Sequence, residues 1–288
     1  MNFQQILFPV DFSDACNSVA KHVSAMASLF HAKITLVHAV EDPLKWYGHP
    51  NPEKVLEADI PKVLSDAEES LESFAETRFP DVDAGIVFEL GGPLDLIEKT
   101  ALGRKADLIM MPTHGRGRFR AGLLGSVTAK VLHDLPIAVW TEAHAEANPP
   151  EHHLPIRKIA CAIDLGPNSV HVLRSGSDFA KRCGASMFIA HGVPVAEMEL
   201  GAYSKVAPPV YMEDFGRAEI GKLQAEAGTA AEVWIESGPI GSVVRKAALE
   251  WNADLVVMGR GKISHLAGCV GAHAYPLIRD SPCPVLSI

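Results

Sequence analysis

The sequence predicts an α/β protein built from two doubly wound, five-stranded parallel-sheet domains that are related by internal duplication. Two observations support this prediction. Short apolar runs such as residues 6–10 alternate with longer stretches of helical periodicity such as residues 15–30. Such alternation favours parallel strands covered by helices on both faces. The same order of patterns is then found a second time in the chain.

The duplication is visible in residues that recur at a nearly constant spacing. The run Ile6–Asp11 is echoed by Ile159–Asp164, 153 positions later. Further matches keep an offset between 146 and 153, and they pair Ala27 with Ala180, Ala32 with Ala185, His38 with His191, Asp107 with Asp254, Gly115 with Gly261, Gly125 with Gly271, Asp134 with Asp280 and Pro136 with Pro282. We therefore expect domains at residues 1–142 and 156–288, joined by a polar, proline-bearing linker at 143–155.

Composition and charge exclude several classes of protein. The net charge of −9 argues against binding to nucleic acid or to an anionic membrane surface. No apolar run approaches the roughly 20 residues that span a bilayer, and the N-terminus lacks a signal pattern. The five cysteines form no CxxC pair, which suits a reducing compartment. We expect a cytoplasmic protein that binds neither nucleic acid nor membrane.

The elements of the first domain can be placed in order from local signals. Ser13-Asp14 is a helix-capping signal in front of the first helical pattern, and Gly91-Gly92-Pro93 places a proline at the start of another. The expected strands are residues 6–10, 33–40, 85–89, 107–111 and 137–140, and the expected helices are 15–30, 53–78, 94–102 and a last one through 127–132.

The stretch from Met111 to Val127 has the layout of a phosphate-binding loop. A buried strand is followed by a loop rich in glycine and arginine and by a helix that opens with Gly125-Ser126. Small residues let the backbone approach an anion, and the first amides of the helix point at it. A simple corner with a serine cap is the alternative interpretation. No Gly-Lys-Ser/Thr follows, so the loop is not a Walker loop.

The predicted sheet brings this loop close to two other segments. In doubly wound sheets, ligands lie beyond the carboxyl ends of the strands, where the winding direction reverses. That rule places the end of the first strand, Pro9-Val10-Asp11, the end of the second, His38-Ala39, and the 111–127 loop around one crevice.

The spacing of Gly115, nine residues and Gly125-Ser126 resembles the ATP-binding signature of the universal stress protein family, Gly-x-x-Gly-(x)9-Gly-Ser/Thr. The opening at residues 6–13 is also similar to that family, and the resemblance spans essentially the whole chain. It implies a tandem-type universal stress protein with two adenine nucleotide alpha-hydrolase-like, Rossmann-like domains. It also implies binding of ATP, AMP or ADP, with Mg²⁺ held through the phosphates. Pro112 departs from the signature, because the family has glycine there.

The resemblance also implies roles for individual residues. Asp11 would meet the adenine or ribose, the Ala39 backbone the adenine, and Met111 one face of the base. A turn aspartate and a core methionine are the alternatives for the first and last of these. The full set of predicted nucleotide contacts is Pro9, Val10, Asp11, Ala39, Met111, Pro112, His114, Gly115, Arg116, Gly125, Ser126 and Val127.

The second copy departs further from the signature. Its loop reads Met258-Gly259-Arg260-Gly261, then nine residues and Gly271-Ala272, so it is one residue shorter and lacks the serine hydroxyl. Asp164 and Pro239 keep their places. We expect this half to bind nucleotide weakly or not at all, or to carry another ligand.

The expected function is that of a stress-response protein which acts as a nucleotide-dependent switch or as a regulator of an unidentified protein partner. Two alternatives stay open: a slow ATP-hydrolysing or adenylating enzyme of the same superfamily, and a scaffold without nucleotide. The sequence has no convincing nucleophile–base pair and no metal-binding cluster, and His114 is the one candidate base in the loop. By the resemblance, residues 137–140 and 285–288 would pair antiparallel into an intramolecular pseudo-dimer, with a homodimer of chains left open.

Overall fold

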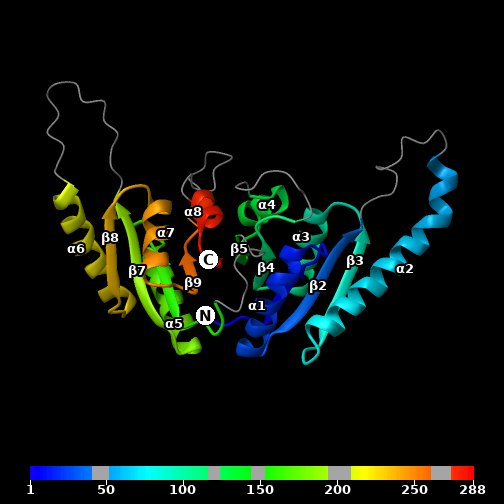
Figure 1. The fold of residues 1–288 in the computed structure, drawn as a ribbon, viewed down its shortest axis with the longest axis horizontal. Coiled ribbons are helices and arrows are strands. Elements are labelled where there is room, and N and C mark those ends of the chain that lie inside the picture. The colour runs from blue at the N-terminus through cyan, green and yellow to red at the C-terminus, as the bar shows by residue number, and fades with distance from the viewer. Residues whose placement is uncertain (41–51, 116–123, 144–152, 194–208, 261–273) are drawn as a thin grey trace, which may run out of the picture. The chain divides into compact units, whose positions relative to one another are not determined.

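The computed structural model describes residues 1–40, 52–115, 124–143, 153–193, 209–260 and 274–288 (Figure 1). They form two compact units, which meet in sequence between Trp140 and Thr141. We call the unit before this point the N-terminal module and the unit after it the C-terminal module.

The N-terminal module alternates strands and helices as the sequence predicts. Its elements are β1 (Gln5–Pro9), α1 (Asp14–Phe30), β2 (Lys33–Val40), α2 (Pro52–Arg78), β3 (Ala84–Leu90), α3 (Pro93–Arg104), β4 (Leu108–Pro112), α4 (Ser126–Asp134) and β5 (Ala138–Glu142). The strand order is β3-β2-β1-β4-β5. The central strand β1 pairs in parallel with β2 on one side and with β4 on the other. The winding direction therefore reverses between β1 and β4, next to the predicted crevice.

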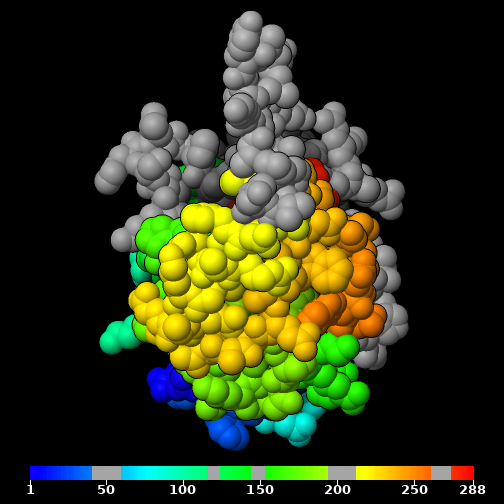
Figure 2. Space-filling model, turned by 90° about the vertical axis from the view of Figure 1, so that its left-hand side faces the viewer, coloured from blue at the N-terminus to red at the C-terminus, as the bar shows by residue number. Residues whose placement is uncertain are grey.

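The C-terminal module repeats this arrangement. Its elements are β6 (Lys158–Ala162), α5 (Ser169–Cys183), β7 (Ser186–Val193), α6 (Pro209–Ala227), β8 (Glu232–Ser237), α7 (Ile240–Glu250), β9 (Leu255–Met258), α8 (Ala274–Asp280) and β10 (Val285–Ser287). The order β8-β7-β6-β9-β10 matches that of the first module. Helix α6, in yellow, forms much of the surface of this module seen in Figure 2.

Local chemistry explains where the helices begin and end. The Ser13 hydroxyl accepts a hydrogen bond from the Cys16 amide at 3.1 Å, so the predicted cap of α1 is present. Helix α3 begins at Pro93 behind Gly92, because a proline at the first position gives up no helical hydrogen bond. Helix α5 ends at Cys183, and the capping residue Gly184 follows with φ of 66°, a left-handed conformation that glycine adopts without strain.

The cores of both modules are centred on strands that are buried on both faces. Ile6, Leu7 and Phe8 of β1 are fully buried, and so are Leu255, Val256 and Val257 of β9. Apolar runs without polar alternation are typical of parallel strands between two layers of helices.

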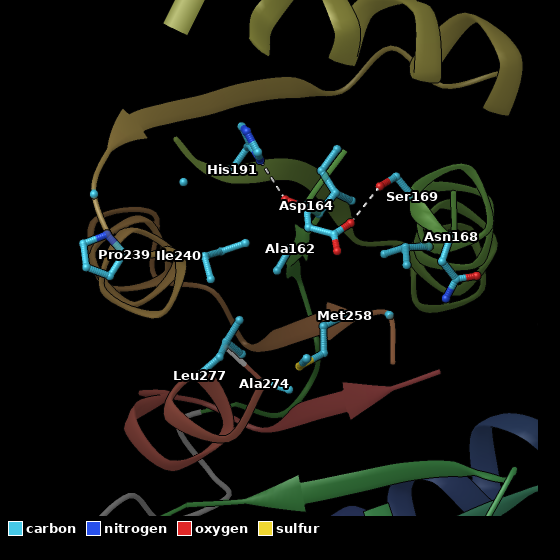
Figure 3. A pocket seen from close by; sticks show the side chains of 15 residues that line it. Ala162, Asp164, Asn168, Ser169, His191, Pro239, Ile240, Met258, Ala274 and Leu277 are labelled. Carbon is cyan, nitrogen blue, oxygen red and sulfur yellow. Dashed lines mark hydrogen bonds between the residues drawn. The ribbon is translucent and has the colours of Figure 1, made fainter. Parts of the chain in front are cut away.

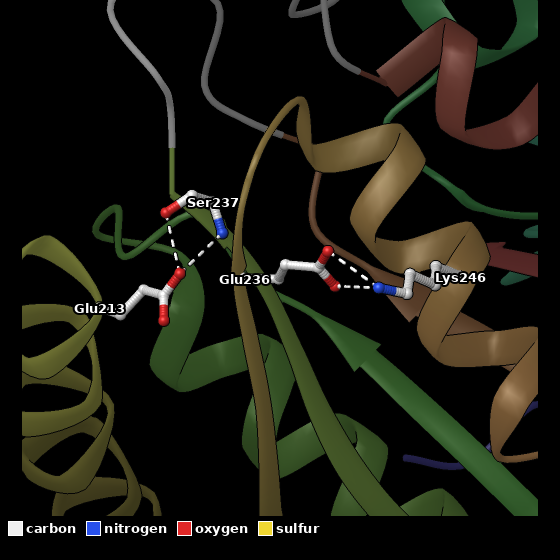
Figure 4. Close-up of polar contacts among 4 residues, drawn as sticks. All are labelled: Glu213, Glu236, Ser237 and Lys246. Carbon is white, nitrogen blue, oxygen red and sulfur yellow. Dashed lines mark hydrogen bonds and ion pairs between the residues drawn. The ribbon is translucent and has the colours of Figure 1, made fainter. Parts of the chain in front are cut away.

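Two polar contacts are also present in both modules. Nδ1 of His38 donates to the Val10 carbonyl at 2.7 Å, and Nδ1 of His191 donates to the Ile163 carbonyl at 2.8 Å. A lysine on α3 or α7 also meets a glutamate on the edge strand of its module. Lys99 lies 2.6 Å from Glu89, and Lys246 lies 2.9 Å from Glu236 (Figure 4). Duplicated side-chain contacts support the duplication that the sequence predicts.

Four cysteines lie in the described part of the chain, and all four are free thiols. Burial raises the pKa of Cys16, Cys161 and Cys283 to about 12 and that of Cys183 to about 11. These thiols stay protonated at neutral pH, and the three buried ones pack as small apolar groups. In the same residues, no helix combines the length and apolar character needed to span a membrane.

Candidate functional site

The end of β1 is fixed to β2 on one side of the predicted N-terminal crevice. The Val10 amide donates to the Val37 carbonyl at 2.8 Å, which continues the parallel pairing past the last residue of the strand. The bond from His38 holds the Val10 carbonyl. Phe12 then takes a left-handed conformation with φ of 59°, and its ring packs on His38 with centroids 4.9 Å apart. The chain therefore turns sharply at Asp11.

Asp11 connects this turn to the loop after β4. Its Oδ1 accepts hydrogen bonds from the Ser13 amide at 3.0 Å and from the Ser13 hydroxyl at 2.6 Å. A Cβ added at Gly115 would overlap Oδ2 of the same carboxylate. Gly115 is therefore the residue that lets the loop backbone lie against the aspartate. One carboxylate oxygen of Asp11, Oδ1, stabilises the turn, and the other, Oδ2, faces the predicted phosphate loop.

Gly125 permits a second close approach, at the start of α4. Its amide donates to the Thr113 carbonyl at 2.7 Å, and a Cβ there would lie 3.0 Å from that carbonyl oxygen. The Thr128 hydroxyl donates to the Pro112 carbonyl at 3.1 Å. These bonds fix the first turn of α4 against the end of β4.

The first turn of α4 has no side-chain cap. Gly125 is the N-cap residue and supplies no side-chain hydrogen bond, and the turn holds no acidic residue. Ser126 is exposed and Val127 is half-buried. Amides at the start of a helix have no partner within the helix, so they are suited to hold an anion.

The equivalent crevice of the C-terminal module contains a cavity of about 210 Å³ (Figure 3). Its walls are mainly apolar and come from β6, α5, α7, β9 and α8, with Ala162, Val172, Ile240, Met258 and Leu277 among them. Asp164 and His191 also line it. Asp164 and Pro239 can be matched to the first module from the sequence, but these apolar walls cannot. Residues on separate helices become neighbours only through the tertiary fold.

A comparison with models of known protein families identifies the family of this chain. The model described as the universal stress protein family matches residues 2–141 and 155–288. The chain belongs to the universal stress protein family.

Individual family members are similar over one module or over the whole chain. A universal stress protein of Thermus aquaticus is 35% identical over 138 residues, which is 48% of this chain and 96% of that protein. A universal stress protein of Mycobacterium tuberculosis is 24% identical over 98% of this chain and 95% of its own length. The crystal structure of a universal stress protein from Archaeoglobus fulgidus has 25% identity and a TM-score of 0.69, covering 99% of this chain and 97% of that one. Tandem organisation is therefore shared with full-length relatives.

For this universal stress protein, the structure brings most of the predicted contact residues to one edge of the first sheet. Pro9 ends β1, Ala39 lies in β2 opposite Glu89, and Met111 and Pro112 end β4. Nδ1 of His114 lies 2.9 Å from the Thr113 hydroxyl. Arg116 lies outside the described residues. Within the ranges that are described, no three His, Cys, Asp or Glu residues are placed to hold a metal ion.

Proposed function

We propose that the N-terminal module binds an adenine nucleotide in the crevice between Asp11, Ala39 and the start of α4. We further propose that the protein acts as a nucleotide-dependent regulator of a protein partner. Mg²⁺ would arrive with the nucleotide and be held mainly by the phosphates.

The observation that carries this proposal is the pair of close approaches at Gly115 and Gly125. At Gly115 a side chain would overlap the Asp11 carboxylate, and at Gly125 it would press on the Thr113 carbonyl. Two glycines beside a helix start without a side-chain cap leave the backbone amides there accessible. Such amides are suited to bind the negatively charged oxygens of a phosphate chain. The family signature at these same positions agrees with that interpretation.

Pro112 removes one backbone donor but leaves those of α4 in place. Its carbonyl is engaged by the Thr128 hydroxyl at the end of β4. The amides and hydroxyl suited to a phosphate belong to Ser126 and Val127, which follow Gly125. Asp11 is suited to accept a hydrogen bond from the nucleoside portion, because a carboxylate accepts from hydroxyl and amino groups. In this arrangement the chain's residues bind and orient the nucleotide.

The test uses the full chain labelled with ¹³C at the methionine methyl groups. Met111 is 5% exposed at the end of β4, so its methyl group reports on the N-terminal crevice. Saturating ATP with magnesium is expected to shift the Met111 signal. Asp11→Asn is expected to weaken binding about tenfold or more, because a hydrogen bond to a charged acceptor is lost.

Asp164→Asn is the matched control, since it makes the same change at the equivalent position of the C-terminal module. It is expected to leave the ATP response of Met111 unchanged. A Met111 signal that does not move at saturating ATP in the folded protein would contradict the proposal.

The pairing of the closing strands of the two modules stays a prediction that rests on the family resemblance. Val139→Pro and Leu286→Pro each remove one backbone donor from such a pair. Either variant is expected to loosen the association of the modules, as measured by small-angle scattering. Unchanged scattering would contradict it.

A further inference from the structure

Two bulky residues at matched positions hold a left-handed backbone conformation that no helix end explains. Phe12 and Leu165 both have φ of 59°, and they lie 153 positions apart, directly after Asp11 and Asp164. The other non-glycine residues with positive φ in the described ranges lie at or just after the ends of α1, α3 and α7, where this conformation is common. For a bulky side chain it is strained, and such strain clusters at ligand sites.

The left-handed residue turns the amide that follows it back onto the aspartate. In the N-terminal module, Oδ1 of Asp11 accepts from the Ser13 amide at 3.0 Å. In the C-terminal module, Oδ1 of Asp164 accepts from the Gly166 amide at 2.8 Å. This bond fixes the carboxylate of Asp11 while its Oδ2 is directed at Gly115. The orientation of the aspartate therefore depends on the residue that follows it.

The side chain of Phe12 is held by rings from two other elements. Its ring centroid lies 4.9 Å from that of His38 on β2 and 5.9 Å from that of Phe74 on α2. His38 is itself bonded to the Val10 carbonyl, and Phe74 is buried. Aromatic pairs of this kind stabilise a contact beyond the burial of apolar area. Glycine would adopt the same φ without strain, so what the phenylalanine adds is this anchored ring.

We propose that Phe12 is a positioning residue for the candidate nucleotide site. Its ring, anchored on His38 and Phe74, keeps residue 12 left-handed and so holds Asp11 in its binding orientation before a ligand arrives. A group that is already oriented loses less conformational freedom on binding, so the ring raises affinity without touching the nucleotide. The effect on affinity rests on the proposed function, whereas the orientation of Asp11 is a property of the ligand-free protein.

The ligand-free test follows hydrogen exchange of the Ser13 amide in the full chain. Phe12→Gly is expected to raise the exchange rate about tenfold or more, because glycine samples both signs of φ and has no ring to hold it. Phe12→Leu gives residue 12 the side chain that the C-terminal module has at this conformation, and it is expected to raise the rate by a smaller factor. Phe12→Tyr keeps the ring and is expected to retain the wild-type rate. Leu165→Gly is the matched control and is expected to leave the exchange of Ser13 unchanged.

The ligand test follows ATP with magnesium through the methyl signal of Met111. Phe12→Gly is expected to weaken binding about tenfold, and Phe12→Tyr to retain the wild-type affinity. Leu165→Gly is expected to leave the affinity unchanged. The urea transition of Met26, which is buried on α1, measures the stability of the same module. A ring with a merely structural role would change the stability and leave the ATP affinity of the folded protein as it is.

The two tests separate the failure of this proposal from that of nucleotide binding. The proposal is overturned if Ser13 exchanges at the wild-type rate in both Phe12→Gly and Phe12→Leu, or if Phe12→Tyr exchanges as fast as Phe12→Gly. It is also overturned if the wild-type protein and Phe12→Gly bind ATP equally tightly. If ATP leaves Met111 unmoved in the wild-type protein, the proposed function fails, and the exchange of Ser13 still decides whether Phe12 orients Asp11.

Discussion

The two modules share their scaffold and differ at the same edge of their sheets. Both tie the end of the first strand to the second through a histidine, His38 or His191. In the N-terminal module the Asp11 carboxylate lies against Gly115. In the C-terminal module the equivalent Asp164 borders a cavity. Duplication has preserved the contacts that hold the strands together, while the surroundings of the two aspartates have diverged.

A second difference lies one residue beyond the shared histidine. The N-terminal module has Ala39 there, and the C-terminal module has Gly192. At Gly192 the start of α7 comes so close that a Cβ would lie 2.8 Å from Cα of Ile240. The C-terminal crevice is therefore closed on this side by contact between two backbone segments, which leaves no room for a side chain at residue 192.

The largest expected effect comes from alkaline pH, which separates the modules by their buried thiols. Burial raises the pKa of Cys161 and Cys283 in the C-terminal module, and of Cys16 in the N-terminal module, from 9.0 to about 12. It also raises the pKa of Cys183 in the C-terminal module to about 11. The stability that each thiol contributes is complete below pH 9 and is lost as the pH rises from 9 toward 12, because the unfolded chain ionises first. At pH 10 each thiol lowers the free energy of unfolding by about 1 kcal/mol.

We therefore expect the C-terminal module to lose about two to three times as much as the N-terminal module between pH 8 and pH 10 from this cause, with Cys183 contributing less than a full share because it is only half-buried. Urea titrations followed through the methyl signals of Met258 and Met26 measure the two modules separately. The triple variant Cys161→Ala, Cys183→Ala and Cys283→Ala is the control, and it should flatten the pH dependence of the Met258 transition alone. An unchanged dependence would contradict the assignment to these thiols.

The second prediction concerns the close approach at Gly192. Gly192→Ala is expected to destabilise the C-terminal module by about 2 kcal/mol, because the added methyl group meets the backbone of α7. Urea titration followed through Met258 measures it. Ala39→Gly at the matched position is expected to cost only about 0.5–1 kcal/mol, through the greater freedom of the unfolded chain. Equal effects of the two variants would show that the modules do not differ here.

Most of the fold could be predicted because its signals are local. The apolar run at residues 33–40 is strand β2 with the same bounds, and Ser13 caps α1. The expected and the observed helices and strands of the N-terminal module differ only in the residues at which they begin and end. The first strand was expected at 6–10 and is Gln5–Pro9, and the last of the module was expected at 137–140 and is Ala138–Glu142. Strand ends depend on pairing with neighbours that local periodicity does not report.

The candidate site could be predicted only in part, because its geometry is set by tertiary contacts. The sequence places Asp11 and Gly115 at the ends of two strands, and doubly wound topology brings these ends together. It does not indicate that the Asp11 carboxylate leaves no space for a side chain at Gly115. Nor does it indicate the cavity beside Asp164, whose walls come from three helices and three strands.

The third prediction compares how the first helix of each module is capped. The Ser13 side chain accepts from the Cys16 amide, whereas Asn168 at the start of α5 makes no side-chain cap bond. Ser13→Ala is expected to destabilise the N-terminal module by about 1 kcal/mol, and Asn168→Ala to change the other module by much less. The urea transitions of Met26 and Met258 measure this difference. A cost for Asn168→Ala as large as that for Ser13→Ala would contradict it.

The smallest expected effect concerns the duplicated ion pairs on the edge strands. Lys99 with Glu89 and Lys246 with Glu236 are both exposed, and such pairs are screened by water and salt. The two pairs differ in one respect, because Nζ of Lys246 also lies 5.8 Å from the centre of the Trp234 ring. Hydrogen bonding to Glu236 raises the pKa of Lys246.

We therefore expect Glu89→Gln and Glu236→Gln to leave the urea midpoints nearly unchanged, and 1 M salt to remove any difference that remains. Glu236→Gln is expected to alter Trp234 fluorescence, since Lys246 is then held near the ring only by the aromatic face. Trp234→Phe in the same background identifies the source of that signal. If either glutamine variant shifted its module as far as Ser13→Ala does, these pairs would have to be counted among the contacts that hold the duplicated scaffold together.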